Sequence, residues 1–225
     1  MELANAARYE AADRAVDRAI RLDAQPRYRV LKGMLEILHR RYDEAEDLFG
    51  GMLKLGGSTA GAHAGFGHLA IVRQQYDQAV SELNEALKEL GNETDDRPYR
   101  SWLEQTVYLG LGWADANRDR HRVALQSFNM ALAIAPDGIL ALIGKGHALV
   151  GLHRMEEAER VFNRVLELNE GNPFALAELA GIEYARGQDD AALKHYHAAL
   201  AARPEDFTCP YEGLGLIFLR QGASG

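Results

Sequence analysis

Residues 108–136 read YLGLGWADANRDRHRVALQSFNMALAIAP, and three of their positions recur along the chain at a fixed step. The first position holds a small residue: Gly112 is followed 34 residues later by Gly146 and 34 later again by Ala180, and Gly33 is followed by Gly67 at the same step. An alanine series and, four residues behind it, an aromatic or leucine series keep this step: Ala45, Ala79, Ala124, Ala158 and Ala192, with Phe49, Leu83, Phe128, Phe162 and Tyr196. Such self-similarity indicates a solenoid of stacked repeats.

The composition favours helices within each repeat. Alanine, leucine, glutamate and arginine dominate the 225 residues, valine and isoleucine are sparse, and only six prolines occur. On intrinsic propensity this mixture favours α-helices over β-sheets. We therefore expect an all-α chain.

The repeat resembles that of the tetratricopeptide repeat (TPR) family, whose pattern W-x2-L-G-x2-Y, then A-x3-F, then A and P, describes two antiparallel helices. The best single match is formed by Tyr108, Leu111, Gly112, Ala124, Phe128, Ala131 and Pro136. The turn segments 41–45 and 75–79 also resemble the family's G-x-Y-x-x-A junction. The resemblance covers nearly the whole chain and implies an all-α, right-handed superhelical solenoid of antiparallel helix pairs, with about 12 helices.

On this pattern we expect one TPR solenoid over residues 1–225. It contains five repeats at approximately 26–59, 60–90, 98–138, 139–172 and 173–207, an N-terminal half repeat at 9–25 and a C-terminal half repeat at 208–222. The last helix has no second helix after it, which indicates either a fragment of a longer protein or an end that a partner subunit covers. Between Gly67 and Gly112 the step is 45 residues, so an insertion lies near 91–101, as a functional edge or as a tolerated surface loop.

Four pairs of glycines separated by one residue lie inside the predicted first helices, at 65–67, 110–112, 144–146 and 213–215. Because they recur in register with the repeat, we interpret them as structural rather than as nucleotide-binding loops. The second glycine of each pair is the family's packing glycine. The first costs about 1 kcal/mol in a helix interior, so it implies a close approach, either of the neighbouring repeat or of a ligand backbone.

Several classes of function are disfavoured by composition and motifs. The formal net charge is -8, without a basic cluster, so we expect no nucleic-acid binding. The single cysteine, Cys209, allows no disulfide framework, and we expect no metal site because no i, i+4 histidine pair occurs. No P-loop or nucleophile elbow is present, so we expect no catalysis and no cofactor. No segment predicts a signal peptide or a membrane span, which favours a cytoplasmic protein.

The family resemblance places particular first-helix positions on the inner, concave surface of the solenoid. Carried over, these candidate groove residues are Met34, Ile37, His68, Ile71, Leu109, Trp113, Asn117, Ile143, His147, Val150, Phe174 and Tyr184. They are mostly apolar and lack the Lys, Arg and Asn set of family members that grip a C-terminal carboxylate. Some of them are expected to belong to the core between repeats instead.

The resulting functional prediction is a protein–protein interaction scaffold that binds a peptide or partner helix in an apolar concave groove. The expected partner is another protein or peptide, anchored by an apolar or aromatic side chain. Two alternatives stay open. One is a self-assembling structural TPR module, a dimer or filament formed through the incomplete ends. The other is a regulatory arm of a larger protein.

Overall fold

The computed structural model describes residues 2–23, 25–55, 59–91, 97–202 and 209–222. Twelve α-helices and no β-strand lie within these residues, which confirms the predicted all-α fold of repeated helices. The chain forms two compact units, Met1–Arg118 and Asp119–Gly225. The division falls inside the segment 98–138 that the sequence predicts as one repeat, and each unit is described by itself below.

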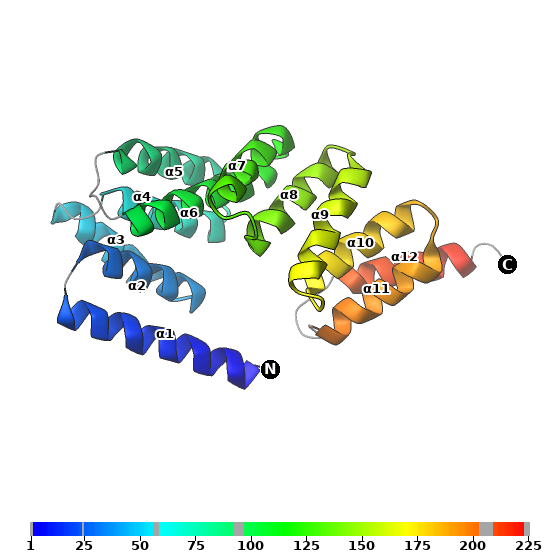
Figure 1. Cartoon of the computed structure of the whole chain (residues 1–225), viewed down its shortest axis with the longest axis horizontal. Helices are drawn as coiled ribbons and strands as arrows, with labels where there is room; N and C mark the ends of the chain where they lie inside the picture. Colours follow the sequence, from blue (N-terminus) through cyan, green and yellow to red (C-terminus); the bar gives the residue numbers. More distant parts are fainter. Residues whose placement is uncertain (1, 24, 56–58, 92–96, 203–208, 223–225) are drawn as a thin grey trace. The chain divides into compact units, whose positions relative to one another are not determined.

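Six helices belong to the first unit (Figure 1). They are α1 (Glu2–Leu22), α2 (Pro26–Leu38), α3 (Tyr42–Lys54), α4 (Thr59–Val72), α5 (Tyr76–Leu90) and α6 (Arg97–Ala116). The predicted half repeat at 9–25 corresponds to one continuous helix that begins at Glu2. Residues 92–96 of the predicted insertion lie outside the described residues, and α6 follows them with 20 residues, against 13 in α2 and 14 in α4.

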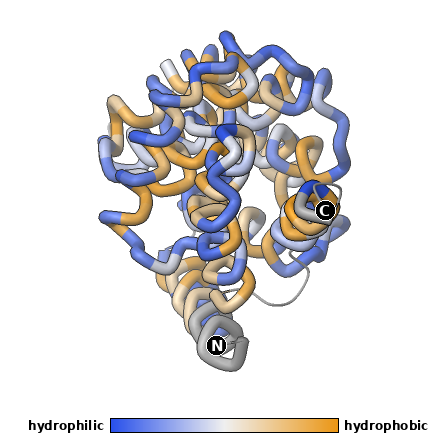
Figure 2. The backbone as a smooth tube through the Cα atoms, turned by 90° about the vertical axis from the view of Figure 1, so that its right-hand side faces the viewer, coloured by the Kyte–Doolittle hydropathy of each residue, from blue (hydrophilic) through white to orange (hydrophobic). Residues whose placement is uncertain are grey.

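The second unit also contains six helices. They are α7 (His121–Ile134), α8 (Ile139–Gly151), α9 (Met155–Leu168), α10 (Pro173–Ala185), α11 (Asp189–Ala202) and α12 (Cys209–Gly222). Hydrophobic and hydrophilic residues are interleaved along the backbone trace, as expected for helices that bury one face (Figure 2). No helix among the described residues of either unit is long and apolar enough to cross a membrane.

The turn between the two helices of a repeat has one residue in the left-handed backbone region. These residues follow the period of the sequence: Arg40, Gln74, Asp119, His153 and Gly187, with φ between 56° and 75°. Only the last is a glycine, the residue that adopts this conformation without steric cost. The 34-residue period is therefore a period of backbone conformation as well as of side chains.

The paired glycines receive large side chains from the second helices. Phe49 on α3 fills the space beside both Gly33 on α2 and Gly65 on α4, so that a Cβ atom on either glycine would lie closer than 3.0 Å to its ring. The second glycine of a pair thus packs against its own repeat, and the first packs against the preceding repeat. The same contacts recur in Leu83 with Gly67 and Gly110, Phe128 with Gly144, Phe162 with Gly146, and Tyr196 with Gly213. Of the two explanations for the first glycine of a pair, the structure shows close approach of the neighbouring repeat.

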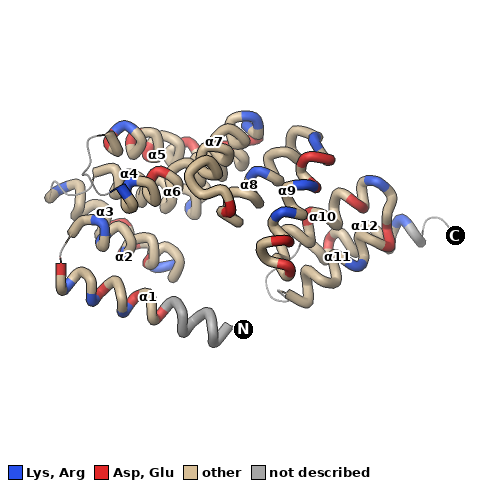
Figure 3. Tube along the Cα trace, viewed as in Figure 1, with Lys and Arg blue, Asp and Glu red and all other residues tan. Residues whose placement is uncertain are grey.

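Ion pairs join consecutive repeats at the surface. Arg73 at the end of α4 donates to Glu46 of α3 at 2.7 Å, and Arg186 after α10 donates to Glu159 of α9 at 2.7 Å. His39 lies 3.3 Å from Asp13 at the matching position between α2 and α1. The helix α1 therefore takes the place of a second helix beside α2. Elsewhere, acidic and basic residues are spread along the helices of each unit (Figure 3).

Candidate functional site

The first turns of α6 bring two aromatic side chains to the first repeats. Tyr99 and Trp102 stack on each other, with ring centroids 5.9 Å apart and an interplanar angle of 27°. Both rings pack against the cluster of buried residues around Val30 and Phe49, and also against the cluster around Leu103. The extension of α6 thus contacts the cluster around Val30 and Phe49 of the first repeat as well as the cluster around Leu103.

An open apolar hollow of about 310 Å³ lies between this extension and α2. Its walls are formed by Leu31 on one side and by Pro98, Tyr99 and Trp102 on the other, and Arg27 adds a charged side chain. The volume is at the lower end of the range for ligand pockets, ~300–1,000 Å³. The guanidinium of Arg27 lies over the ring of Tyr28, 4.9 Å from its centroid, which fixes the cation at this side of the hollow.

Three of the predicted groove residues pack against the same clusters of buried residues. Met34 packs against both clusters that Tyr99 and Trp102 touch, Ile37 packs against the cluster around Val30, and Ile71 against the cluster around Leu103. All three are half-buried. Met34 thus shares both clusters with the aromatic pair of α6, whereas Ile37 and Ile71 each share one of them.

His68 lies between α4 and α6. Its Nε2–H donates to the backbone carbonyl of Thr106 at 3.2 Å, and a Cβ atom on Gly110 would lie 3.2 Å from its ring. Burial lowers the pKa of His68, and the hydrogen bond to the Thr106 carbonyl partly opposes this effect. The side chain that the sequence predicts as a groove anchor is thus a packed, hydrogen-bonded contact between repeats, a position made possible by the missing side chain of Gly110.

The other predicted residues of the first unit lie further along α6. Leu109 and Trp113 are half-buried, whereas Asn117 is exposed. The Nδ2 of Asn117 donates to the backbone carbonyl of Trp113 at 2.8 Å. The side-chain amide thus forms a hydrogen bond with a carbonyl at the C-terminal end of α6. The structure does not group these residues with the hollow beside α2.

In the second unit, the predicted apolar residues differ in exposure. Ile143 is 7% exposed, Val150 is half-buried, and Phe174 is 40% exposed. Tyr184 lies under Arg220 of α12, whose guanidinium is 3.9 Å from the ring centroid and donates to the Tyr184 carbonyl. The face of the Tyr184 ring that the sequence predicts as a ligand anchor is thus occupied by Arg220.

His147 belongs to a polar cluster inside the second unit. Its ring meets His121 of α7 edge-on, with centroids 6.3 Å apart. On α10, burial raises the pKa of Glu178, and the charge of His147 opposes this shift. Nothing in this cluster forms a metal site, since no group of three potential ligands for a metal ion occurs among the described residues.

None of the five residues that line the hollow is among the groove residues predicted from the sequence: Arg27, Leu31, Pro98, Tyr99 and Trp102. Arg27 could have been predicted from the repeat. It lies six residues before the packing position Gly33, as the predicted groove residue Phe174 lies six residues before Ala180. Pro98 and Tyr99 lie outside the 34-residue period, and only a three-dimensional structure places them against α2.

The profile of the tetratricopeptide repeat family matches residues 1–58 and 143–207, which is more than half of the chain. The chain belongs to the TPR family. The TPR fold implies a scaffold for protein–protein interaction, and this general class is assigned to the chain. No curated protein sequence matches this TPR protein.

Solved TPR structures share its fold. A thermophilic TPR protein of Thermus thermophilus has a TM-score of 0.65 at 18% identity, covering 86% of this chain and 99% of that protein. YrrB, described as a TPR protein with an unusual peptide-binding site, has a TM-score of 0.59 at 18% identity, covering 91% of this chain and all of the other. MamA has a TM-score of 0.56 at 16% identity, covering 77% of this chain and 95% of MamA. At these identities the likeness concerns the fold.

Proposed function

We propose that this TPR protein is a scaffold that holds a peptide or partner helix against an apolar inner surface, with the hollow between α2 and α6 as the anchor point. The observation that carries the proposal is the open hollow of about 310 Å³ beside the stacked Tyr99 and Trp102. Aromatic walls supply large contact areas at small entropic cost, and such sites commonly dominate binding energy.

The chemistry of the hollow selects the partner. Leu31, Pro98 and the aromatic pair favour an apolar or aromatic side chain, because burial of apolar surface is worth roughly 25 cal/mol per Å². Arg27 at the same hollow favours a carboxylate next to that side chain, since a guanidinium pairs well with a carboxylate. The proposed ligand is therefore a segment with one apolar anchor and an adjacent acidic group.

The test is selection of peptides from a random display library on the full chain, followed by affinity measurements on variants. We expect selected peptides to carry an apolar residue beside Asp or Glu, and Leu31→Asp to weaken their binding at least 10-fold. Val123→Asp is the matched control, because Val123 is 44% exposed on α7 in the other unit. Equal loss of affinity in both variants, or none in Leu31→Asp, would contradict the proposal.

A second candidate function, self-association, is favoured by one exposed row of residues on α12, which consists of Tyr211, Gly215 and Phe218. A Cβ atom on Gly215 would meet no described residue within 4 Å, whereas Gly67 and Gly146 at the same repeat position are filled by second helices. On the same face, Tyr211 and Phe218 are 57% and 59% exposed. Under this candidate, a helix of a second copy covers the row. Light scattering would then show concentration-dependent association that Phe218→Lys abolishes, and a strict monomer at millimolar concentration would exclude it.

A further inference from the structure

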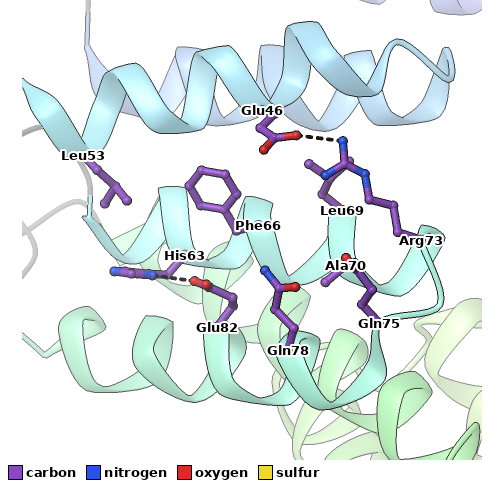
Figure 4. Close-up of a pocket in the computed structure, with 10 residues that line it drawn as sticks. All are labelled: Glu46, Leu53, His63, Phe66, Leu69, Ala70, Arg73, Gln75, Gln78 and Glu82. Atoms are coloured by element: carbon purple, nitrogen blue, oxygen red, sulfur yellow. Dashed lines mark hydrogen bonds and ion pairs between the residues drawn. The ribbon is translucent and has the colours of Figure 1, made fainter.

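A second hollow, of about 190 Å³, lies over α4 between the two neighbouring second helices α3 and α5 (Figure 4). Its apolar part is formed by Leu53 of α3 together with Phe66 and Leu69 of α4. The Phe66 ring meets the buried Phe49 ring edge-on, with centroids 5.8 Å apart. This contact fixes Phe66, so the apolar part of the hollow is preformed.

The polar rim of this hollow is held in place by two ion pairs. At one end the Glu46 carboxylate accepts from Arg73 at 2.7 Å, and at the other His63 Nδ1 lies 2.8 Å from a Glu82 oxygen (Figure 4). Gln78 of α5 lies between them and points toward α4 in the close-up. The arrangement leaves an apolar centre between fixed polar ends.

Gly50 lies on the face of α3 that carries two residues of this hollow, Glu46 and Leu53. It lies four residues after Glu46 and three before Leu53, on the same face of α3. A Cβ atom on Gly50 would meet nothing within 4 Å, in contrast to Gly33 and Gly65, which are packed under Phe49. At the equivalent position the other four repeats have Asn84, Asn129, Asn163 and His197.

A glycine inside a helix costs about 1 kcal/mol relative to alanine. At Gly33 and Gly65 the contact with Phe49 accounts for this cost. At Gly50 no packing contact within the described residues does so. An open space beside an apolar, preformed centre is what binding of an external side chain requires.

The two helices that border the hollow contain more acidic than basic residues, although Arg73 of the rim pairs with Glu46 and Arg118 pairs with Asp77. Each has four acidic residues and one basic residue: Asp43, Glu44, Glu46 and Asp47 with Lys54 in α3, and Asp77, Glu82, Glu85 and Glu89 with Lys88 in α5. Complementary potential governs the choice of partner and the rate of association. A segment with lysine or arginine on both sides of its anchor fits this surface, and an acidic segment does not.

We propose that the hollow lined by Leu53 and Phe66, together with the open space beside it at Gly50, is a second peptide site, which takes one large apolar side chain of a basic segment. The site is separate from the hollow between α2 and α6, and it selects the opposite charge. The chain then holds two different segments, an acidic one beside Arg27 and a basic one between α3 and α5.

The test uses the full chain and three synthetic peptides, Gly-Lys-Lys-Leu-Lys-Lys-Gly and its relatives with alanine for leucine or glutamate for lysine. Titration by ¹⁵N-resolved NMR should show saturable shifts of the Phe66 and Gly50 amides with the first peptide. Both relatives should bind at least 10-fold more weakly. Absence of saturable shifts at α3 and α4 up to several millimolar peptide would overturn the proposal.

Gly50→Leu fills the open space and should weaken the basic peptide at least 10-fold. Because it removes a glycine from a helix interior, it should leave the melting temperature unchanged or higher, so lost binding is not lost folding. Gly51→Leu is the matched control, since its Cβ also meets nothing within 4 Å but lies on another face of α3. Leu31→Asp, the variant of the other hollow, should bind this peptide normally. Equal binding by the two glycine variants would contradict the proposal.

Discussion

The Phe49 ring occupies the space that a Cβ atom on Gly65 would need, with less than 3.0 Å between them. Gly65 belongs to the repeat after Phe49, so this contact is one of the places where a bulky second-helix side chain joins two repeats. It explains why the chain keeps two glycines in one helix, although each lowers helix propensity. A substitution at Gly65 tests the contribution of this contact to stability.

We expect Gly65→Ala to lower the free energy of unfolding by about 1–3 kcal/mol, the usual cost of overpacking a core. The Phe49 ring is fully buried and in contact with Gly33 as well, so it has no free space to move into. Gly215→Ala serves as the control, because its Cβ would meet nothing within 4 Å. Chemical denaturation of both variants checks this, and similar effects at the two sites would contradict the packing account.

The left-handed turn residues allow a reciprocal pair of substitutions. Gln74 has φ 60°, and Gly187 has φ 75° at the equivalent turn. A residue with a side chain pays roughly 1–2 kcal/mol for this conformation. Gln74→Gly should therefore raise the free energy of unfolding by about 1 kcal/mol, and Gly187→Ala should lower it by a similar amount. Thermal melts of the two variants should shift in opposite directions, and shifts of the same sign would count against the assignment.

The pH dependence of stability should carry a contribution from His68. Its pKa in the folded chain is below the ordinary value of 6.5, because the ring is buried against α6. Between the two pKa values the unfolded chain binds more protons, so the free energy of unfolding increases with pH. The contribution is present above pH 6.5 and is lost as the pH falls toward the folded pKa.

The variant His68→Gln isolates this effect, since glutamine keeps a donor for the Thr106 carbonyl but does not titrate. Denaturation curves of both proteins between pH 7.5 and about 5 provide the measurement. The wild type should lose more stability than the variant as the pH falls. Parallel curves would show that His68 does not change its pKa on folding.

The repeat architecture was predictable because its determinants are local and periodic. Ala45, Phe49 and Gly67 have the same neighbours in each repeat, so their spacing alone identifies the helices and their partners. For Gly65 the sequence predicts a close approach either of the neighbouring repeat or of a ligand backbone. Only the structure shows that Phe49 of the preceding repeat lies against Gly65.

The candidate sites were less predictable, because they depend on departures from the period. Tyr99 and Trp102 lie before the periodic part of α6, and nothing in their spacing indicates a contact with the cluster around Val30. Tyr184 was placed on the inner surface by its repeat position, but Arg220 of a later helix covers its ring. Gly50 marks the second hollow by the absence of a side chain, which a search for regular spacing overlooks.

The chain contains two tryptophans, Trp102 beside the hollow and Trp113 further along α6, and their indole N–H signals report separately on these two places. The most direct measurement is a ¹⁵N NMR titration of the full chain with a peptide selected for binding. The Trp102 indole signal should shift with the dissociation constant measured for binding of the peptide, and Leu31→Asp should abolish the shift. A Trp102 signal that stays in place at saturating peptide would contradict the proposed binding surface.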